Sequence, residues 1–145
     1  MLLHVVFVVV LLAVSAKSDD ELTDCQRHQQ LMANSVNSPV TWNITCDSEG
    51  NYNDLQCTHQ TPQWCRCFTK TGALASHPSR KIKKCDCYMK KYEAENTGAT
   101  TCETPRCKTD GSFEPKQCCL TTNQCWCVNE NGEQVGERTS GTLAC

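Results

Sequence analysis

The stretch that decides the fold is Gln117-Cys118-Cys119-Leu120-Thr121-Thr122-Asn123-Gln124-Cys125-Trp126-Cys127-Val128, in which four of twelve residues are cysteines. An earlier stretch has the same pattern, with Gln56-Cys57 followed by Cys65-Arg66-Cys67. Alternate residues of a β-strand share a face, so the two cysteines of each Cys-x-Cys triplet point the same way. The pattern predicts two short strands that each present a pair of sulfurs for cross-linking.

The cysteines around these stretches form one ladder that occurs twice. The first ladder has steps of 21, 11, 8, 2 and 18 residues, and the second has steps of 20, 11, 7, 2 and 18. Agreement within one residue at every step indicates an internal repeat. The first copy is Cys25, Cys46, Cys57, Cys65, Cys67 and Cys85, and the second is Cys87, Cys107, Cys118, Cys125, Cys127 and Cys145. Cys102 and Cys119 are left over and pair with each other by elimination.

The composition places these cysteines in an oxidising compartment. The chain has 145 residues, and 14 of them are cysteines, a density typical of secreted disulfide scaffolds. An apolar run, Val5 to Val14, ends in the small residues Ser15 and Ala16 and is followed by charged residues. The run is too short to span a bilayer, which favours a signal peptide over an uncleaved anchor. We therefore predict a signal peptide over 1–16, an acidic leader over 17–24 and a secreted, extracellular protein.

Charge and residue pattern exclude several functions. The net charge of −2 suggests neither a nucleic-acid partner nor a membrane surface. Zinc binding at Cys-x-Cys is the weaker interpretation in a secreted chain with an even cysteine count, so we expect no metal and no cofactor. The histidines His28, His59 and His77 have no evident nucleophile beside them, so an enzyme is not expected. Arg80, Lys81, Lys83 and Lys84 form a basic run whose commoner interpretation is a solvated strand, with weak polyanion binding as the alternative.

Local signals predict a similar structure in each copy. Thr23 and Gln26 are spaced as a capping box that begins a helix through Ala33, and Asp86 is placed to cap a second helix through Glu95. Strands are predicted over Tyr52–Cys57 and Phe113–Cys118, each after a turn that contains Gly, and hairpin turns at Lys70-Thr71-Gly72 and Asn131-Gly132. We therefore predict a small disulfide-rich α+β fold: two tandem modules over 25–85 and 87–145, each a short helix plus a small irregular antiparallel sheet. Only Asp86 separates the two ladders, so the modules are expected to keep a restrained orientation.

The motifs resemble those of thyroglobulin type-1 modules. The resemblance rests on Cys46-Asp47-Ser48-Glu49-Gly50-Asn51-Tyr52 with Gln56-Cys57 and Cys65-Arg66-Cys67, and on Cys107-Lys108-Thr109-Asp110-Gly111-Ser112-Phe113 with Gln117-Cys118 and Cys125-Trp126-Cys127-Val128. It implies pairing in order along the chain, which gives Cys25–Cys46, Cys57–Cys65, Cys67–Cys85, Cys87–Cys107, Cys118–Cys125 and Cys127–Cys145. Cys102–Cys119 is then an additional bond outside the family pattern.

Arg66 departs from this family pattern. It stands where the motif has tryptophan, as Trp126 does in the second copy. A large ring at this place fills the small core. Trp64 and Phe68, two residues to either side, are the candidates to compensate, and we favour altered packing over a functional role for Arg66.

The resemblance also implies a function. Free-standing modules of this family resemble the thyropins, which block the cleft of papain-like cysteine proteases with three rigid loops and no covalent step. We favour the first module as the inhibitor and expect a monomer, while connecting loops without a function remain an alternative. By position the wedge is Ser35, Val36, Asn37, Ser38 and Pro39 in the first loop, His59, Gln60, Thr61 and Pro62 in the second, and Lys70, Thr71 and Gly72 in the third.

A second class of function stays open. The family also contributes modules to growth-factor-binding and matrix proteins, so a non-inhibitory extracellular binding module for a growth factor, the matrix, heparin or a channel is the alternative. Asn43-Ile44-Thr45 is a glycosylation acceptor, and a glycan on Asn43 is expected near the first loop.

Overall fold

The structure, a computed structural model, describes residues 21–35 and 38–145. The predicted signal peptide 1–16 and residues 17–20 of the predicted leader lie outside these ranges, as do Val36 and Asn37 of the predicted wedge. In the described part of the chain, no helix has the length and apolar character needed to cross a bilayer.

The first helix, α1 (Asp24–Ala33), begins at the predicted capping box. The Thr23 Oγ1 atom accepts a hydrogen bond from the Gln26 backbone N–H at 3.2 Å, and the Gln26 side chain accepts one from the Thr23 N–H at 2.9 Å. These two bonds satisfy N–H groups that a helix start leaves free. The capping box is therefore confirmed.

The second helix, α2 (Asp86–Asn96), corrects the prediction that Asp86 caps it. The N-cap is Cys85, which makes no side-chain capping bond, and Asp86 is the first helical residue. The Cys85 side chain is bonded to Cys67 and has no oxygen to offer the helix. The Asp86 carboxylate in the first turn still interacts favourably with the helix dipole.

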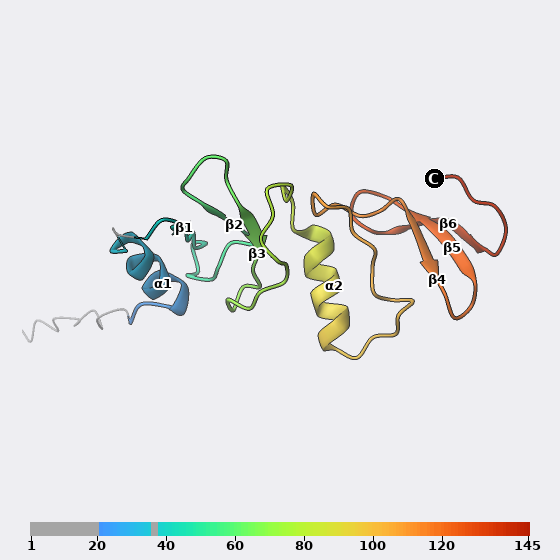
Figure 1. The fold of residues 1–145 in the computed structure, drawn as a ribbon. Coiled ribbons are helices and arrows are strands. Elements are labelled where there is room, and N and C mark those ends of the chain that lie inside the picture. Colours follow the sequence, from blue (N-terminus) through green and yellow to red (C-terminus); the bar gives the residue numbers. More distant parts are fainter. Residues whose placement is uncertain (1–20, 36–37) are drawn as a thin grey trace, which may run out of the picture.

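Each half of the chain has one three-stranded antiparallel sheet (Figure 1). The first joins β1 (Trp42–Asn43), β2 (Leu55–Thr58) and β3 (Cys65–Cys67), and the second joins β4 (Lys116–Cys119), β5 (Gln124–Val128) and β6 (Gln134–Thr139). The predicted strands from Tyr52 and Phe113 start later than expected, because these two residues form only isolated bridges, to Cys46 and Cys107. Asp54 and Pro115, which disfavour strand structure, stand between each bridge and its strand.

Seven disulfides connect these elements, and no cysteine of the described residues is free. They are Cys25–Cys46, Cys57–Cys65, Cys67–Cys85, Cys87–Cys107, Cys102–Cys119, Cys118–Cys125 and Cys127–Cys145. These are the pairs named from the ladder and the resemblance. Residues 21–35 and 38–145 thus form a small disulfide-rich α+β fold with two helices and two small sheets.

The glutamine of each Gln-Cys pair is buried and makes the same three hydrogen bonds in both halves. The Gln56 carboxamide accepts from the Thr45 N–H at 2.8 Å and donates to the carbonyls of Thr45 and Asn53, at 2.8 and 2.7 Å. Gln117 repeats this set with Arg106 and Glu114, at 2.8, 2.9 and 2.7 Å. Each amide fixes the chain that leads into Cys46 or Cys107, which explains why the Gln-Cys motif recurs.

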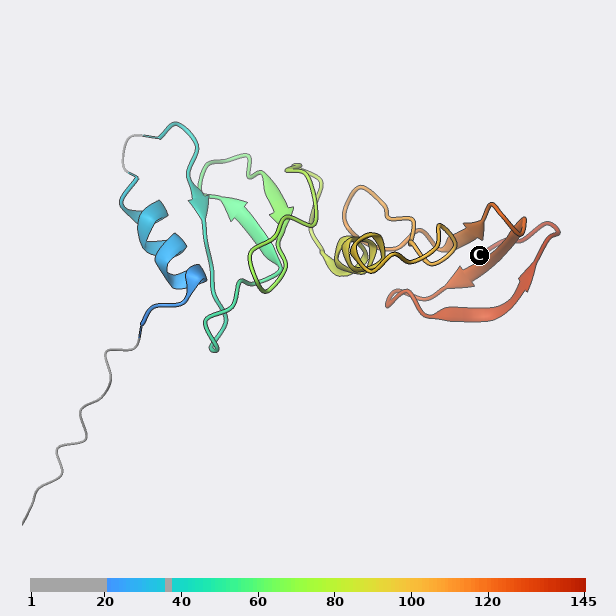
Figure 2. The ribbon, with the colours of Figure 1, turned by 90° about the horizontal axis from the view of Figure 1, so that it is seen from below.

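The two halves are joined by more than the covalent linker. The N–H groups of Lys83 and Lys84, in the first half, donate to the Asp110 carbonyl of the second half, at 2.8 and 3.0 Å. Tyr88 and Met89 of α2 also pack against the buried cysteine and isoleucine cluster of the first half. The halves consequently lie end to end with α2 between the two sheets (Figures 1 and 2).

Candidate functional site

The described parts of two of the three predicted wedge loops lie side by side at one edge of the first half (Figure 2). We call the first, residues 34–41, the leading loop and the second, residues 59–64, the hairpin loop. The His59 N–H donates to the Thr41 carbonyl at 3.0 Å, and the Gln60 side-chain oxygen accepts from the Thr41 N–H at 3.2 Å. Together they form what we call the loop end.

The base of the hairpin loop is tightly held. The Cys57–Cys65 disulfide spans it with a Cα–Cα distance of 4.0 Å. Inside this bond, the Thr58 N–H donates to the Trp64 carbonyl at 2.8 Å, and the Trp64 N–H donates to the buried Thr58 hydroxyl at 3.0 Å. Such a loop loses little conformational entropy when a partner binds it.

The tip of the loop end is exposed and uncharged. His59, Gln60, Thr61 and Pro62 are all exposed, as are Ser38 and Pro39 of the leading loop. Val40 is 53% exposed, and Trp64 is 42% exposed. Neither loop contains Asp, Glu, Lys or Arg, so with histidine counted as neutral, as at pH 7, a partner that encloses this end desolvates no formal charge.

The third predicted loop is not part of the loop end. Lys70, Thr71 and Gly72 lie at the opposite edge of the half, where the Lys70 carbonyl accepts from the Tyr52 N–H at 3.1 Å. A Cβ at Gly72 would stand 2.7 Å from the Tyr52 ring, which shows how closely this turn packs there. The reason is geometric: the hairpin loop and this turn flank the two ends of β3, and opposite ends of a strand point in opposite directions. The three-loop grouping is therefore corrected to two loops.

The segment Ser79–Arg80 lies against the base of the hairpin loop. Ser79 pairs with Cys65 through two backbone hydrogen bonds of 3.0 and 2.8 Å. This pairing brings the Arg80 guanidinium to 5.1 Å from the centre of the Trp64 ring. Arg80 thus brings a cation to the base of the hairpin loop, a neighbour that spacing along the sequence does not reveal.

Arg66 is held between two rings. Its Cζ atom lies 4.1 Å from the centre of the Trp42 ring and 4.9 Å from that of Phe68. Burial lowers the pKa of the Arg66 guanidinium. Phe68 therefore compensates as predicted, whereas Trp64 stays exposed and Trp42 takes its place. Trp42 was missed because it comes from another strand, and spacing around Cys-x-Cys carries no information about it.

Asn43 is exposed on β1, next to the leading loop. The neighbouring Ile44 is buried, and the Thr45 hydroxyl donates to the Gln56 side chain at 3.3 Å. Strand alternation thus directs Asn43 outward, which is the arrangement that a glycan needs. Glycosylation of Asn43 stays a prediction.

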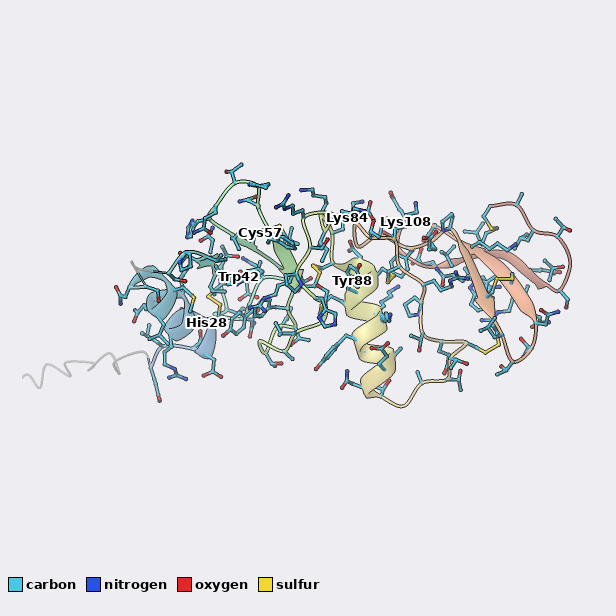
Figure 3. The ribbon with its side chains drawn as sticks, viewed as in Figure 1. His28, Trp42, Cys57, Lys84, Tyr88 and Lys108 are labelled. Atoms are coloured by element: carbon cyan, nitrogen blue, oxygen red, sulfur yellow. A yellow bond between two sulfur atoms is a disulfide. The ribbon has the colours of Figure 1, made fainter. Side chains whose placement is uncertain are left out.

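The basic run lies on the surface around one buried anchor. Ile82 is 1% exposed, while Arg80, Lys81, Lys83 and Lys84 are exposed on either side of it. Lys108 comes close to this run because the turn at 108–111 accepts the N–H groups of Lys83 and Lys84 (Figure 3).

Comparison with known proteins gives the family. The sequence profile described as thyroglobulin type-1 repeat matches residues 88–145, which form the second half of the chain. U24-ctenitoxin-Pn1a of Phoneutria nigriventer is 34% identical over 115 residues, which cover 79% of this chain and 88% of that protein. U20-hexatoxin-Hi1a of Hadronyche infensa is 32% identical over 141 residues, which cover 95% and 97%.

Equistatin of Actinia equina is 29% identical over 152 residues, which cover 97% of this chain and 63% of that protein. The similarity to the two toxins extends over most of both chains, and the profile match falls on the half that carries Cys125-Trp126-Cys127-Val128. This chain belongs to the thyroglobulin type-1 family.

Proposed function

We propose that the protein is a secreted inhibitor of papain-like cysteine proteases, built from two tandem thyroglobulin type-1 modules over 25–85 and 87–145. The loop end of the first module enters the protease cleft and covers the catalytic centre without a covalent step.

The observation that carries this proposal is the loop end itself. The leading loop and the hairpin loop are hydrogen-bonded to each other, the Cys57–Cys65 bond anchors the hairpin loop, and both present uncharged tips. An edge whose hairpin loop is held at its base and whose two loops contain no Asp, Glu, Lys or Arg suits a partner whose binding surface is a cleft. The repeated glutamine hydrogen bonds and the repeated disulfide ladder support two copies of one module.

The proposal is tested by titrating the oxidised protein against papain and lysosomal cathepsins with a fluorogenic peptide substrate. We expect reversible inhibition that competes with substrate. Absence of inhibition at micromolar protein, with all seven disulfides verified by mass spectrometry, would overturn the proposal.

A matched pair of variants locates the inhibitory surface. Val40 and Val135 are 53% and 54% exposed, and they lie in different halves. Val40→Glu places a charge at the loop end and should weaken inhibition at least tenfold, whereas Val135→Glu should leave it unchanged. Thr71→Glu should also have little effect, because its turn lies at the opposite edge.

Polyanion binding is the second candidate function. It is favoured by the way in which the buried Ile82 anchors the basic run at the surface. This anchor fixes the segment so that Arg80, Lys81, Lys83 and Lys84 face solvent together, with Lys108 beside them. Asp54, Asp86 and Glu130 line the same surface as Lys83 and Lys84, which weakens the field of the basic run.

Heparin affinity chromatography separates the two candidates. If the basic run binds polyanions, Lys81→Gln should lower the salt concentration needed for elution. Lys70→Gln, at the opposite edge of the first half, should not change it. Elution of the unmodified protein at low salt would rule out this second candidate.

A further inference from the structure

A cleft of about 560 Å³ lies between the two halves, apart from the loop end. One wall is formed by Arg66 and the segment 74–78, and the other by α2. Tyr88 and Tyr92 stand four residues apart on α2, so they share the face that lines this cleft. Figure 3 places Tyr88 on α2, toward the first half.

The Arg66 guanidinium in this wall carries a charge without a counter-ion. Among the described residues no hydrogen bond or ion pair is formed by its side chain, and its buried Nε atom has no partner. Trp42 and Phe68 contact the guanidinium through their rings, at 4.1 and 4.9 Å. Such stacking holds the group in place and leaves its two terminal Nη groups, though not the buried Nε, free for an acceptor.

The other charged residues of the cleft are already paired. Lys91 and Glu95, one turn apart on α2, lie 3.9 Å from each other. Arg66 is therefore the unpaired charge of the cleft. Leu74, Pro78 and the rings of the two tyrosines supply the apolar part of the remaining wall, and Ser76, His77 and Asn96 supply its polar part.

We propose that this cleft binds an organic carboxylate. The planar guanidinium fork of Arg66 matches the two oxygens of a carboxylate, and the apolar part of the ligand lies against Tyr88 and Tyr92. The cleft is much larger than an inorganic anion, which favours a ligand with such an apolar part. A free organic acid and the C-terminal carboxylate of a peptide share this chemistry. The site is independent of protease inhibition, since it includes no residue of the loop end.

An NMR titration of the oxidised protein tests this site and identifies the source of the carboxylate. The probes are N-acetylphenylalanine and a neutral peptide that ends in a free phenylalanine carboxylate, each compared with its amide. We expect saturable chemical-shift changes at Tyr88 and His77 with the two acids and none with the two amides. Whichever of the peptide and the free acid binds more tightly is the preferred source of the carboxylate. Equal shifts with the amides, or shifts confined to residues 80–84, would overturn the proposal.

Variants test the role of Arg66. Arg66→Gln should weaken binding of N-acetylphenylalanine by about tenfold or more, and Arg66→Lys, which keeps the charge but loses the fork, should have an intermediate effect. Arg138→Gln is the matched control, because Arg138 also stacks on a tryptophan but does not line the cleft. If inorganic sulfate competes as well as the acid, the apolar walls play no part and the proposal is wrong. If Arg66→Gln does not form all seven disulfides, the titration of the unmodified protein decides.

Discussion

At the scale of single residues, both halves contain an arginine stacked on a tryptophan, but the two residue types have exchanged positions. Positions 66 and 126 are equivalent in the cysteine ladder, but the first holds arginine and the second tryptophan. In the second half, Arg138 covers Trp126, with the Arg138 Cζ atom 4.0 Å from the ring centre. In the first half, Trp42 covers Arg66 at 4.1 Å. The stacking of a cation on a ring is thus preserved, while the first half presents its cation to the cleft.

Replacement of Gln56 by alanine should destabilise the first half. The side chain is fully buried and makes three hydrogen bonds to backbone groups of Thr45 and Asn53. Their loss leaves buried N–H and carbonyl groups without partners, at a cost of about 3 kcal/mol. Denaturant unfolding of the oxidised protein measures this. Gln63→Ala, in the exposed hairpin loop, is the control and should change stability little; equal effects of the two variants would contradict the argument.

Asp47 should make the first half sensitive to acid. The hydrogen bond from the Asn51 backbone N–H is the largest cause that lowers the pKa of this carboxyl. Hydrogen bonds from the Asn51 side chain and the Glu49 N–H lower it further. A lowered folded-state pKa gives stability that is present above the unfolded value of about 3.9 and is lost as pH falls through the folded pKa.

The measurement for Asp47 is an NMR titration between about pH 5 and pH 2, with thermal unfolding at each pH. We expect the Asp47 carboxyl to titrate below its ordinary value and the stability of the turn to fall in the same range. Asp47→Asn keeps an acceptor oxygen but does not titrate, so this variant should lose less stability on acidification. A steeper acid loss in Asp47→Asn than in the unmodified protein would disprove the assignment.

At the scale of elements, the sequence predicts best where the signal is local. The Thr23 capping box and the turns at Gly50, Gly72, Gly111 and Gly132 were predicted from adjacent residues, and the structure contains each of them. The start of α2 was misassigned, since the local preference of Asp86 for a cap yields to the Cys67–Cys85 bond. β1 was not predicted at all, because two residues carry no periodic pattern.

The candidate site shows the same limit. The leading and hairpin loops were named from the resemblance, and the structure brings them together. The resemblance also groups the Lys70–Gly72 turn with them, although β3 separates this turn from the hairpin loop by the length of a strand. Arg80 was known only as part of a basic run, because its approach to Trp64 depends on the pairing of Ser79 with Cys65.

The Cys102–Cys119 bond should matter for one segment of the second half. It ties the residues after α2 to the buried end of β4, with a sequence separation of 17. In the chain-entropy picture a loop of this length contributes about 3 kcal/mol. The double variant Cys102→Ala/Cys119→Ala should therefore lower stability by about this amount. Hydrogen exchange should become faster in 97–105 but not in the first half; uniform loss of protection in both halves would refute this local role.

At the scale of the whole molecule, α2 has two roles. It follows the linker as the first element of the second half, yet Tyr88 and Met89 pack on the core of the first. The cleft with Arg66 exists only while this packing holds the halves together. The loop end does not depend on it, since all of its hydrogen bonds lie within the first half. The two proposed sites should therefore respond differently when the joint between the halves is loosened.

Gly111→Ala should loosen this joint. Gly111 has a φ of +92°, and a Cβ there would lie 1.8 Å from the Lys84 carbonyl oxygen, so the turn must move away from the linker. We expect a changed relative alignment of the halves in residual dipolar couplings and weaker carboxylate binding in the cleft, with protease inhibition retained. Gly136→Ala is the matched control, because Gly136 has a φ of +76° but no atom within 4 Å of the added Cβ. Both variants carry the backbone strain of a left-handed residue, about 1–2 kcal/mol, so only the contact with Lys84 distinguishes them. Identical alignment of the halves in the two variants would show that the Gly111 turn does not set their orientation.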